Sequence, residues 1–397
     1  QRYFLNGIPY GPEFRVPTVT AGNQAGTATV ALPDGGYVIY WGGRSVLGQR
    51  YNSLDEKVGG AFTVSTAGGL NPAATLLENG QIAVTWTGAH AYNGYTDVYV
   101  QRMTVGGARA GSVISTGYPV LETRDTHTVP SITKLVGGGF VVTWTELMDL
   151  SDGLSYEIRG QVFNDNGTKS GGLFMVPTNR YGVQDDSSVT ALADGGFLVT
   201  WSTLYGGSDG TDIHYQRYAY NGTRIGGENK ANTFTGGHQS KPDAVLLADG
   251  GFLIAWQSRS ADGSGDGIVA QRYDRGGGKV GVEFHLDTTG AANLSDVDLS
   301  ARPDGGFVAT WVNGDGSGTG IVSRVYTTMN DGPVIEGMDQ VVAAGGTLQA
   351  AALVRAGHAQ GDEYVGNNLQ VIKQYQFVDT SGGGGYFGLN GEAKAPG

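Results

Sequence analysis

Two glycine-rich segments place oxygen-bearing side chains at alternate positions, a pattern that can bind a metal ion. The two sets are Asp262, Ser264 and Asp266, and Asn313, Asp315 and Ser317. Alternate residues can face a common centre while glycine allows the turn, as in the first half of a calcium loop. Neither segment has a glutamate at the twelfth position, and Asp, Ser and Gly are also ordinary turn formers. The pattern predicts either two calcium sites or two solvated turns, and no cofactor other than calcium is expected.

Signatures of catalytic residues are weak. Gly206, Ser208 and Gly210 match the form G-x-S-x-G, but they lie in a polar segment without the strand-to-helix context of a nucleophile elbow. The six histidines lack the spacing of a zinc protease, and no carboxylate pair stands out for glycoside chemistry. We therefore expect a protein that is not an enzyme.

A tryptophan and an arginine recur along the chain. The positions are Trp41, Trp86, Trp144, Trp201, Trp256 and Trp311, and Arg50, Arg102, Arg217, Arg272 and Arg324. Tryptophan can stack on sugars, but each one here ends an apolar run, which favours packing in the core. Arginine can bind a carboxylate ligand, but pairing with Asp or carbonyl groups of a neighbouring repeat is favoured.

These residues belong to an internal repeat that must position them. Each tryptophan closes a phrase such as Asp249–Trp256 (DGGFLIAW), and the phrases recur every 45 to 58 residues. Every repeat holds up to four short runs rich in β-branched and aromatic residues, separated by Gly, Asn and Asp. The tryptophan-ended run is apolar on both faces, which is typical of a sheet covered on both sides. We expect an all-β, six-bladed β-propeller, with a solenoid or a string of small sandwiches as alternatives.

The order of the runs predicts how the ring closes. The sixth repeat lacks a fourth run, whereas an extra one, Glu13–Val16, precedes the first repeat. We expect this N-terminal strand to complete the sixth blade. The pattern stops at Pro333, so residues 1–332 are expected to form the propeller and residues 333–397 a small β-rich module. In that module Gln374–Asp379 and Tyr386–Gly391 are expected to form two strands.

Composition limits the partners. The net charge of −12 argues against binding nucleic acid or anionic membrane, and no apolar run is long enough to insert into a bilayer. The chain has no cysteine, which excludes disulfides and thiol chemistry. No N-terminal signal peptide is visible in the residues given.

The repeat resembles one found in large secreted bacterial surface proteins of the RTX and adhesin type. The resemblance rests on Asp249 to Phe284, with the phrases DGGFLIAW, AQRYD and EF, and covers most of residues 1–332. It implies export by a type I secretion route and a place at the cell surface, and no particular activity. The glycine-rich nonapeptide of RTX calcium rolls is absent here, so calcium dependence does not follow from the resemblance.

The main functional hypothesis is an extracellular, non-catalytic structural or adhesive protein that assembles with itself into a layer, filament or matrix. Its terminal strands are expected to add to the open edge of a neighbouring copy. The residues expected to do so are Glu13, Phe14, Arg15, Val16, Tyr386, Phe387, Leu389 and Asn390. The alternatives are a lectin-like propeller that binds surface glycans and a hydrolase of polysaccharide. The hydrolase would need one cluster of acidic residues instead of six equivalent sites.

Overall fold

The computed structural model divides the chain into two compact units, Gln1–Asp331 and Gly332–Gly397. Described residues are 2–3, 9–10, 12, 14–17, 24–89, 96–116, 129–150, 153–179, 182–204, 210–259, 266–287, 294–314, 319–326, 387–389 and 392–394. They contain strands and turns and no helix, so the all-β class is confirmed. No helix among them is long and apolar enough to cross a membrane.

The strands of the first unit follow the six sequence repeats, which we number one to six. Repeats one to three hold β3 (Ala25–Ala31), β4 (Tyr37–Gly42), β5 (Val46–Tyr51), β6 (Lys57–Ser65); β7 (Leu70–Leu76), β8 (Ile82–Ala89), β9 (Thr96–Met103), β10 (Ile114–Ser115); and β11 (Ser131–Lys134), β12 (Phe140–Leu150), β13 (Gly153–Phe163), β14 (Lys169–Met175). Repeats four to six hold β15 (Val183–Ala191), β16 (Phe197–Leu204), β17 (Asp212–Tyr218), β18 (Arg224–Lys230); β19 (Gln239–Leu246), β20 (Phe252–Arg259), β21 (Asp266–Tyr273), β22 (Lys279–His285); and β23 (Ser295–Ala301), β24 (Phe307–Gly314), β25 (Thr319–Tyr326).

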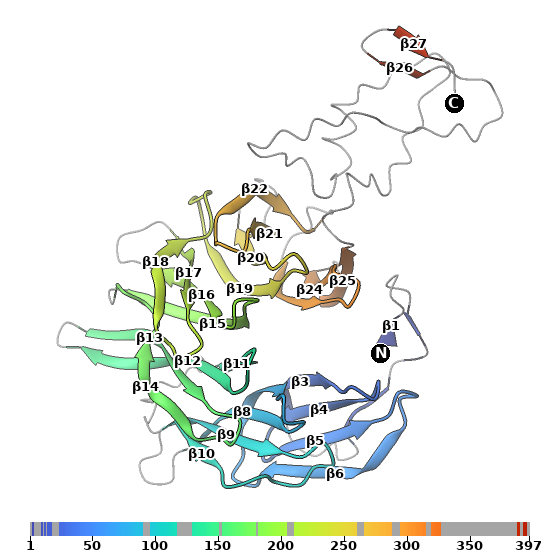
Figure 1. The fold of residues 1–397 in the computed structure, drawn as a ribbon, viewed down its shortest axis with the longest axis vertical. Coiled ribbons are helices and arrows are strands. Elements are labelled where there is room, and N and C mark those ends of the chain that lie inside the picture. Colours follow the sequence, from blue (N-terminus) through green and yellow to red (C-terminus); the bar gives the residue numbers. More distant parts are fainter. Residues whose placement is uncertain are drawn as a thin grey trace. The chain divides into compact units, whose positions relative to one another are not determined.

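Successive repeats are stacked face to face in a propeller-like arrangement. The first strand of each repeat contacts the first strand of the next, from β3 through β7, β11, β15 and β19 to β23. Figure 1 shows β11, β15 and β19 toward the middle of this unit, and β6, β10, β14, β18 and β22 at its periphery. Five apolar clusters fill the spaces between consecutive repeats, so the sheets cover one another.

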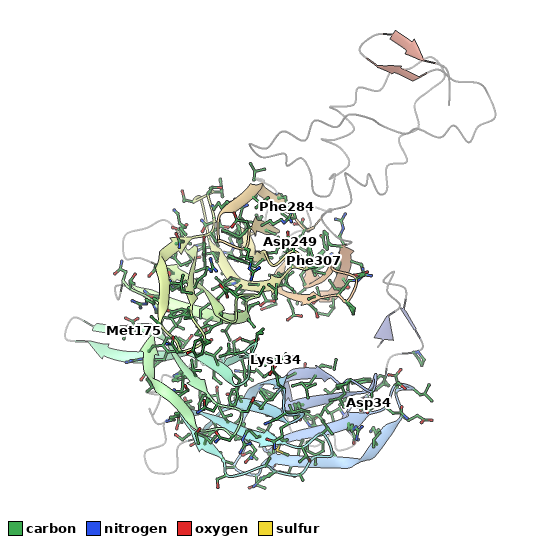
Figure 2. All side chains as sticks on the ribbon, viewed as in Figure 1. Asp34, Lys134, Met175, Asp249, Phe284 and Phe307 are labelled. Carbon is green, nitrogen blue, oxygen red and sulfur yellow. The ribbon has the colours of Figure 1, made fainter. Side chains whose placement is uncertain are left out.

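Five of the six tryptophans, all but Trp41, belong to these clusters. Trp86, Trp144, Trp201 and Trp256 are fully buried, and Trp41 and Trp311 are nearly so. This confirms that they pack in the core and do not present their faces to a ligand. Aromatic residues at the start of the second strand and the end of the third stack in pairs, as Phe307 and Tyr326 do at 4.5 Å between ring centres. In Figure 2, Phe307 lies near Phe284, the fourth-strand residue of repeat five that packs against the same cluster.

The prediction of six separate four-stranded blades is met only in part. The described residues of the repeats form four sheets of four or more strands, and a three-stranded one. Repeats three and four share one eight-stranded sheet, because Tyr156 and Val183 form a parallel bridge between β13 and β15. Repeat six has only β23, β24 and β25.

The predicted closing strand is not paired as expected. Phe14–Pro17 lies outside any strand, while β1 (Arg2–Tyr3) pairs with β2 (Pro9–Tyr10) as a separate two-stranded sheet. Glu13 lies outside the described residues. Closure of the sixth sheet by this segment is therefore absent among the described hydrogen bonds.

In the second unit the described residues form one hairpin. The strand β26 (Phe387–Leu389) pairs with β27 (Glu392–Lys394), with Phe387 opposite Lys394. Phe387–Leu389, within the predicted strand Tyr386–Gly391, thus forms a strand, and its partner follows it in sequence. Tyr386, Asn390 and the other expected strand, residues 374–379, lie outside the described residues.

Candidate functional site

The repeated Asp-Gly-Gly and Gln-Arg-Tyr phrases build the framework of each repeat. The Asp249 carboxylate accepts a hydrogen bond from the backbone N–H of Gly251 at 2.8 Å and also pairs with Arg272. A side chain at Gly251 would collide with the carbonyl oxygen of Tyr273, so this turn needs glycine. The same arrangement recurs at Asp34, which Figure 2 labels together with Asp249.

The arginines are therefore committed to the scaffold. Arg217 pairs with Asp194 of its own repeat at 2.8 Å and donates to the carbonyl oxygen of Gly276 in the next repeat at 2.5 Å. The expected carbonyl partner is confirmed, but the aspartate belongs to the same repeat. Arg324 is not equivalent to the others: Tyr326 pairs with Phe307 as Tyr273 pairs with Phe252, which puts Arg324 at the position of Gln271.

The expected calcium loops fall mostly outside the described residues. Asp262, Ser264, Asp315 and Ser317 are not described, and Asp266 is described only as the backbone at the start of β21. Asn313 lies in β24, half-buried. No group of three or more His, Cys, Asp or Glu side chains suited to a metal ion occurs within the described ranges. Calcium binding at these loops stays a prediction.

The first strands of the repeats, which we call the inner strands, carry an irregularity that the sequence did not reveal. Five of them have a register shift with one residue in the left-handed region, which we call the bulge position: Gly26, Asn71, Asp186, Lys241 and Asp296, with φ between 50° and 64°. Non-glycine residues enter this region rarely and at a cost of about 1–3 kcal/mol, and such strain concentrates at functional sites. Four of the five are not glycine, so the bulge position is a candidate for a functional site.

In repeats four to six the bulge position carries charge. Lys241 on β19 forms an ion pair with Asp296 on β23. Burial raises the pKa of Asp186, as does the nearby Asp185 carboxylate, and these effects outweigh the charge of Lys241 and a hydrogen bond from its backbone N–H. Burial also acts to raise the pKa of Asp296, but hydrogen bonds from Lys241 and Ser295 and the lysine charge lower it overall. Two carboxyls on either side of one lysine thus have pKa values displaced in opposite directions.

A second position, two residues further along each inner strand, adds another acidic pair. This ladder position pairs with the residue before each tryptophan and is occupied by Ala28, Ala73, Ser131, Ser188, Asp243 and Asp298. Asp243 accepts hydrogen bonds from the Ser188 hydroxyl and the Leu299 N–H, both at 2.7 Å, and so joins three repeats. Burial, followed by repulsion from Asp298, raises the pKa of Asp243 to about 7, and burial raises that of Asp298.

We refer to Asp186, Lys241, Asp243, Asp296 and Asp298 as the inner-strand cluster. Its strands are adjacent, because β15 contacts β19 and β19 contacts β23. Repeat three contacts the same region, because the Thr145 hydroxyl donates at 2.9 Å to Asp185, the residue before Asp186. At the bulge and ladder positions, the first two repeats have only Gly26, Asn71, Ala28 and Ala73. The cluster is therefore a single acidic site in one sector of a repetitive framework.

A buried acidic group lies beside the cluster on the long β12–β13 hairpin. Glu146 forms a 2.8 Å ion pair with Arg159, and burial raises the pKa of Glu146 although the arginine opposes the shift. Glu157 is fully buried directly opposite Glu146. Thr145 connects this hairpin to Asp185, so acidic side chains extend from the inner strands onto a neighbouring repeat.

Sequence reasoning missed the inner-strand cluster entirely. Its carboxyls are spread over three repeats about 55 residues apart, so no local motif joins them. A signal was present, however. When the repeats are aligned on tryptophan, Asp243 and Asp298 stand where the first two repeats have alanine.

Comparison with known proteins gives likeness of fold only. No protein-family model matches the sequence, and no curated protein matches it. Among solved structures, a protein of unknown function from Dyadobacter fermentans is 14% identical with a TM-score of 0.55, covering 77% of this chain and 95% of that one. The α-L-arabinanase of Penicillium chrysogenum, complexed with arabinobiose, is 15% identical with a TM-score of 0.53, covering 76% and 93%. The GH93 α-L-arabinofuranosidase of Fusarium graminearum is 11% identical with a TM-score of 0.52, covering 78% and 95%.

These likenesses support the propeller-like fold and overturn one expectation. The hypothesis of a non-catalytic structural or adhesive protein, and with it the expectation of no enzyme, is contradicted, because glycoside hydrolases are among the structural neighbours. The acidic residues of the inner-strand cluster lie in three different repeats, so no loop or local motif marks them as an acid and base pair. Of the alternatives drawn from the sequence, the polysaccharide hydrolase is the one that these neighbours favour.

Proposed function

We propose that this protein hydrolyses glycosidic bonds in a polysaccharide, with its active site at the inner-strand cluster. The observation that carries the proposal is the pair Asp186 and Asp296, whose pKa values are displaced in opposite directions on either side of Lys241. Glycoside hydrolysis needs two carboxyl groups, one protonated and one ionised, flanking the bond that breaks. Environments that separate two pKa values in this way assign the acid and the base.

The proposed roles follow from those displacements. Asp186, with its raised pKa, donates its proton to the glycosidic oxygen as the bond from that oxygen to the sugar carbon breaks. Asp296, kept ionised by Lys241, either takes a proton from the attacking water or attacks the sugar carbon itself. Lys241 is a positioning residue because it fixes the charge and location of Asp296. The 3.4 Å contact from the Ser202 hydroxyl to the Asp186 carboxyl helps to orient the acid.

Asp243 and Asp298, at the ladder positions, belong to the same site. Burial raises the pKa of both carboxyls, repulsion from Asp298 adds to the shift at Asp243, and the two titrate as a pair. With both oxygens of Asp243 held by neighbouring repeats, this residue ties together the strands that carry the acid and the base. Asp298 is more exposed and is the member placed to contact substrate.

We also propose that the first unit is a ring of six blades, supported by six second strands that each carry a tryptophan and by the clusters that join consecutive repeats. Export, a surface location and relation to RTX-type proteins stay proposals that rest on the sequence resemblance, and so do self-association and glycan partners. An extracellular hydrolase of polysaccharide is compatible with each of them.

Arabinan is the first substrate to test, because two structures of similar fold contain arabinobiose. The purified protein is incubated with linear and branched arabinan and with a panel of other plant and bacterial polysaccharides. Released sugars are measured by chromatography, and proton NMR of the first product shows whether the anomeric configuration is retained or inverted. We expect release of short oligosaccharides or single sugars from at least one polymer.

The control is the variant Asp186→Asn/Asp296→Asn, checked for an unchanged circular dichroism spectrum. It is expected to release no sugar. Release at the wild-type rate by this variant would place the chemistry elsewhere. Binding of a polysaccharide without any product from the wild type would instead identify a lectin.

A further inference from the structure

Among the described residues, no strand pairs with the outer edge of β25, and the sixth sheet exposes an apolar residue at a position that every other repeat buries. Each tryptophan pairs with a residue of the third strand, and the residue before that partner defines a repeat position. It is occupied by Val46, Val98, Ile158, Ile213, Ile268 and Ile321. The first five are fully buried, whereas Ile321 on β25 is 74% exposed. A large apolar side chain at a buried repeat position indicates a surface that is meant to be covered.

In the complete repeats, the fourth strand of one repeat also contacts the repeat that follows. Phe174 on β14 packs against Tyr218 of repeat four, with ring centres 5.1 Å apart at 42°. A basic residue at the start of the following repeat's fourth strand then donates a hydrogen bond to a backbone carbonyl oxygen. That carbonyl belongs to the residue directly after the preceding repeat's fourth strand. Lys169 donates to Thr116 at 2.7 Å, Arg224 to Val176 at 3.0 Å, and Lys279 to Ala231 at 2.7 Å.

The N-terminal segment makes both of these contacts with repeat one. Phe14 packs against Tyr51 with ring centres 5.4 Å apart at 49°, and Lys57 donates to the carbonyl oxygen of Val16 at 3.4 Å. In sequence, Glu13–Val16 (EFRV) aligns with Leu173–Val176 (LFMV). The segment therefore occupies the place of a fourth strand that precedes repeat one.

The residues before this segment have the register of a third and fourth strand. Arg2 lies opposite Tyr10 and Tyr3 opposite Pro9, as Arg272 lies opposite Val280 and Tyr273 opposite Lys279. The strand β1 reaches only Pro9 and Tyr10, which leaves Phe14–Val16 without a strand partner among the described pairings. The strand β25, at eight residues, is long enough to pair with that part.

We propose that the outer edge of β25 binds Phe14–Val16 of the same chain as its fourth strand and so locks the ring. The contacts with repeat one put the segment where a sixth blade would present its fourth strand, and this favours closure within one chain. By the register of repeat five, Val322 lies opposite Arg15 and Ser323 opposite Phe14 in the closed form. Pairing would give the β25 edge its hydrogen bonds, and repeat one would cover Ile321. The proposal does not depend on hydrolysis.

A designed disulfide tests it, because the chain has no cysteine of its own. The full chain carrying Arg15→Cys and Val322→Cys is oxidised at low concentration, separated by size, and analysed by non-reducing electrophoresis and peptide mass spectrometry. Directly opposite residues of antiparallel strands are close enough for a disulfide. We expect an intramolecular cross-link in the monomer. The pair Arg15→Cys and Ser300→Cys, with Ser300 on β23, is the mismatched control and should stay reduced.

A cross-link found only between chains would overturn closure within one chain and indicate strand exchange, and a folded monomer without a cross-link would overturn the proposal altogether. A second measurement does not rely on cysteines. Ile321→Asp should lower the midpoint of thermal unfolding by more than about 5 °C if Ile321 is covered. The matched variant Val282→Asp, at a position 69% exposed on β22, should leave the midpoint unchanged. Equal midpoints for the two variants would contradict coverage of β25.

Discussion

Repeats one and two and repeats four to six share one framework and differ at their inner strands. Both groups bury the tryptophan of the second strand, and in repeats one, four and five a turn aspartate pairs with an arginine of the third strand. At the bulge and ladder positions the first two repeats have Gly, Asn and Ala. The last three have Asp186, Lys241, Asp243, Asp296 and Asp298 at these positions, with Ser188 as the exception.

The difference separates residues that recur in most repeats from residues that occur in only a few of them. Residues that recur in most repeats, such as the turn aspartate, satisfy needs that all sheets have: a tight turn, a paired arginine and a filled core. Residues that depart from the repeat cannot be explained by those needs. A bulge that holds Gly26 in one repeat and Asp296 in another keeps the same backbone, so the backbone conformation does not require a carboxylate there.

The largest expected effect comes from removing the ionised carboxylate. Asp296→Asn should reduce kcat on the best polysaccharide by roughly 10²–10⁴-fold, because the amide cannot accept a proton or attack carbon. Asn71→Asp, which adds a carboxylate at the matching bulge of repeat two, should leave kcat unchanged. Initial-rate kinetics of the two variants measure this directly. A comparable loss in both would remove the distinction between the two regions.

A change in the shared framework should act on stability instead. Trp256→Ala removes a fully buried side chain whose indole N–H donates to the Gln239 side chain at 3.1 Å. We expect a loss of about 3–5 kcal/mol in the free energy of unfolding, measured by denaturant titration. Trp86→Ala in repeat two should cost a similar amount. A much smaller loss in one repeat would show that the framework is not equivalent throughout.

A smaller loss is expected at the turn. Asp249→Ala removes the hydrogen bond to the Gly251 N–H and the partner of Arg272, and the partly exposed pair limits the cost to about 1–2 kcal/mol. Asp34→Ala should behave alike in repeat one. Both variants should keep the wild-type kcat at 25 °C. A selective loss of activity on changing Asp249 would extend the site beyond the inner strands.

The smallest expected effect is a displacement of the pH profile. Lys241 lowers the pKa of both Asp186 and Asp296, so Lys241→Met should raise both. Activity requires Asp296 ionised and Asp186 protonated, so both limbs of the profile should move to higher pH, by on the order of one unit. The pH dependence of kcat/KM checks this. Limbs that stay in place, or move to lower pH, would remove Lys241 from the site.

The sequence predicted the framework well because its causes are local and repeated. Burial of the tryptophan run follows from its apolar faces, and the turn from Asp-Gly-Gly. The N-terminal spare strand was visible for the same reason, since Glu13–Val16 repeats a known phrase. The sequence also predicted that this strand completes the sixth blade, but no described hydrogen bond shows that pairing.

The site was not predicted because it is defined by space and not by a motif. Asp186, Lys241 and Asp296 are single residues on three strands, and only stacking of the repeats brings them together. Their left-handed backbone is also invisible in sequence, since four of the five bulge residues belong to types that also form ordinary turns. Repeat alignment could have found the departures at Asp243 and Asp298, but not the opposed pKa values at Asp186 and Asp296.

The central claim is that Asp186 is the proton donor for glycosidic bond cleavage, and its most direct test compares two substrates. Wild type and Asp186→Asn are assayed on the polysaccharide and on a dinitrophenyl glycoside of the same sugar, whose leaving group needs no proton. We predict that the variant loses roughly 10²–10⁴-fold in kcat/KM on the polysaccharide and less than about tenfold on the dinitrophenyl glycoside. Equal losses on both substrates, or no loss on the polysaccharide, would contradict the assignment.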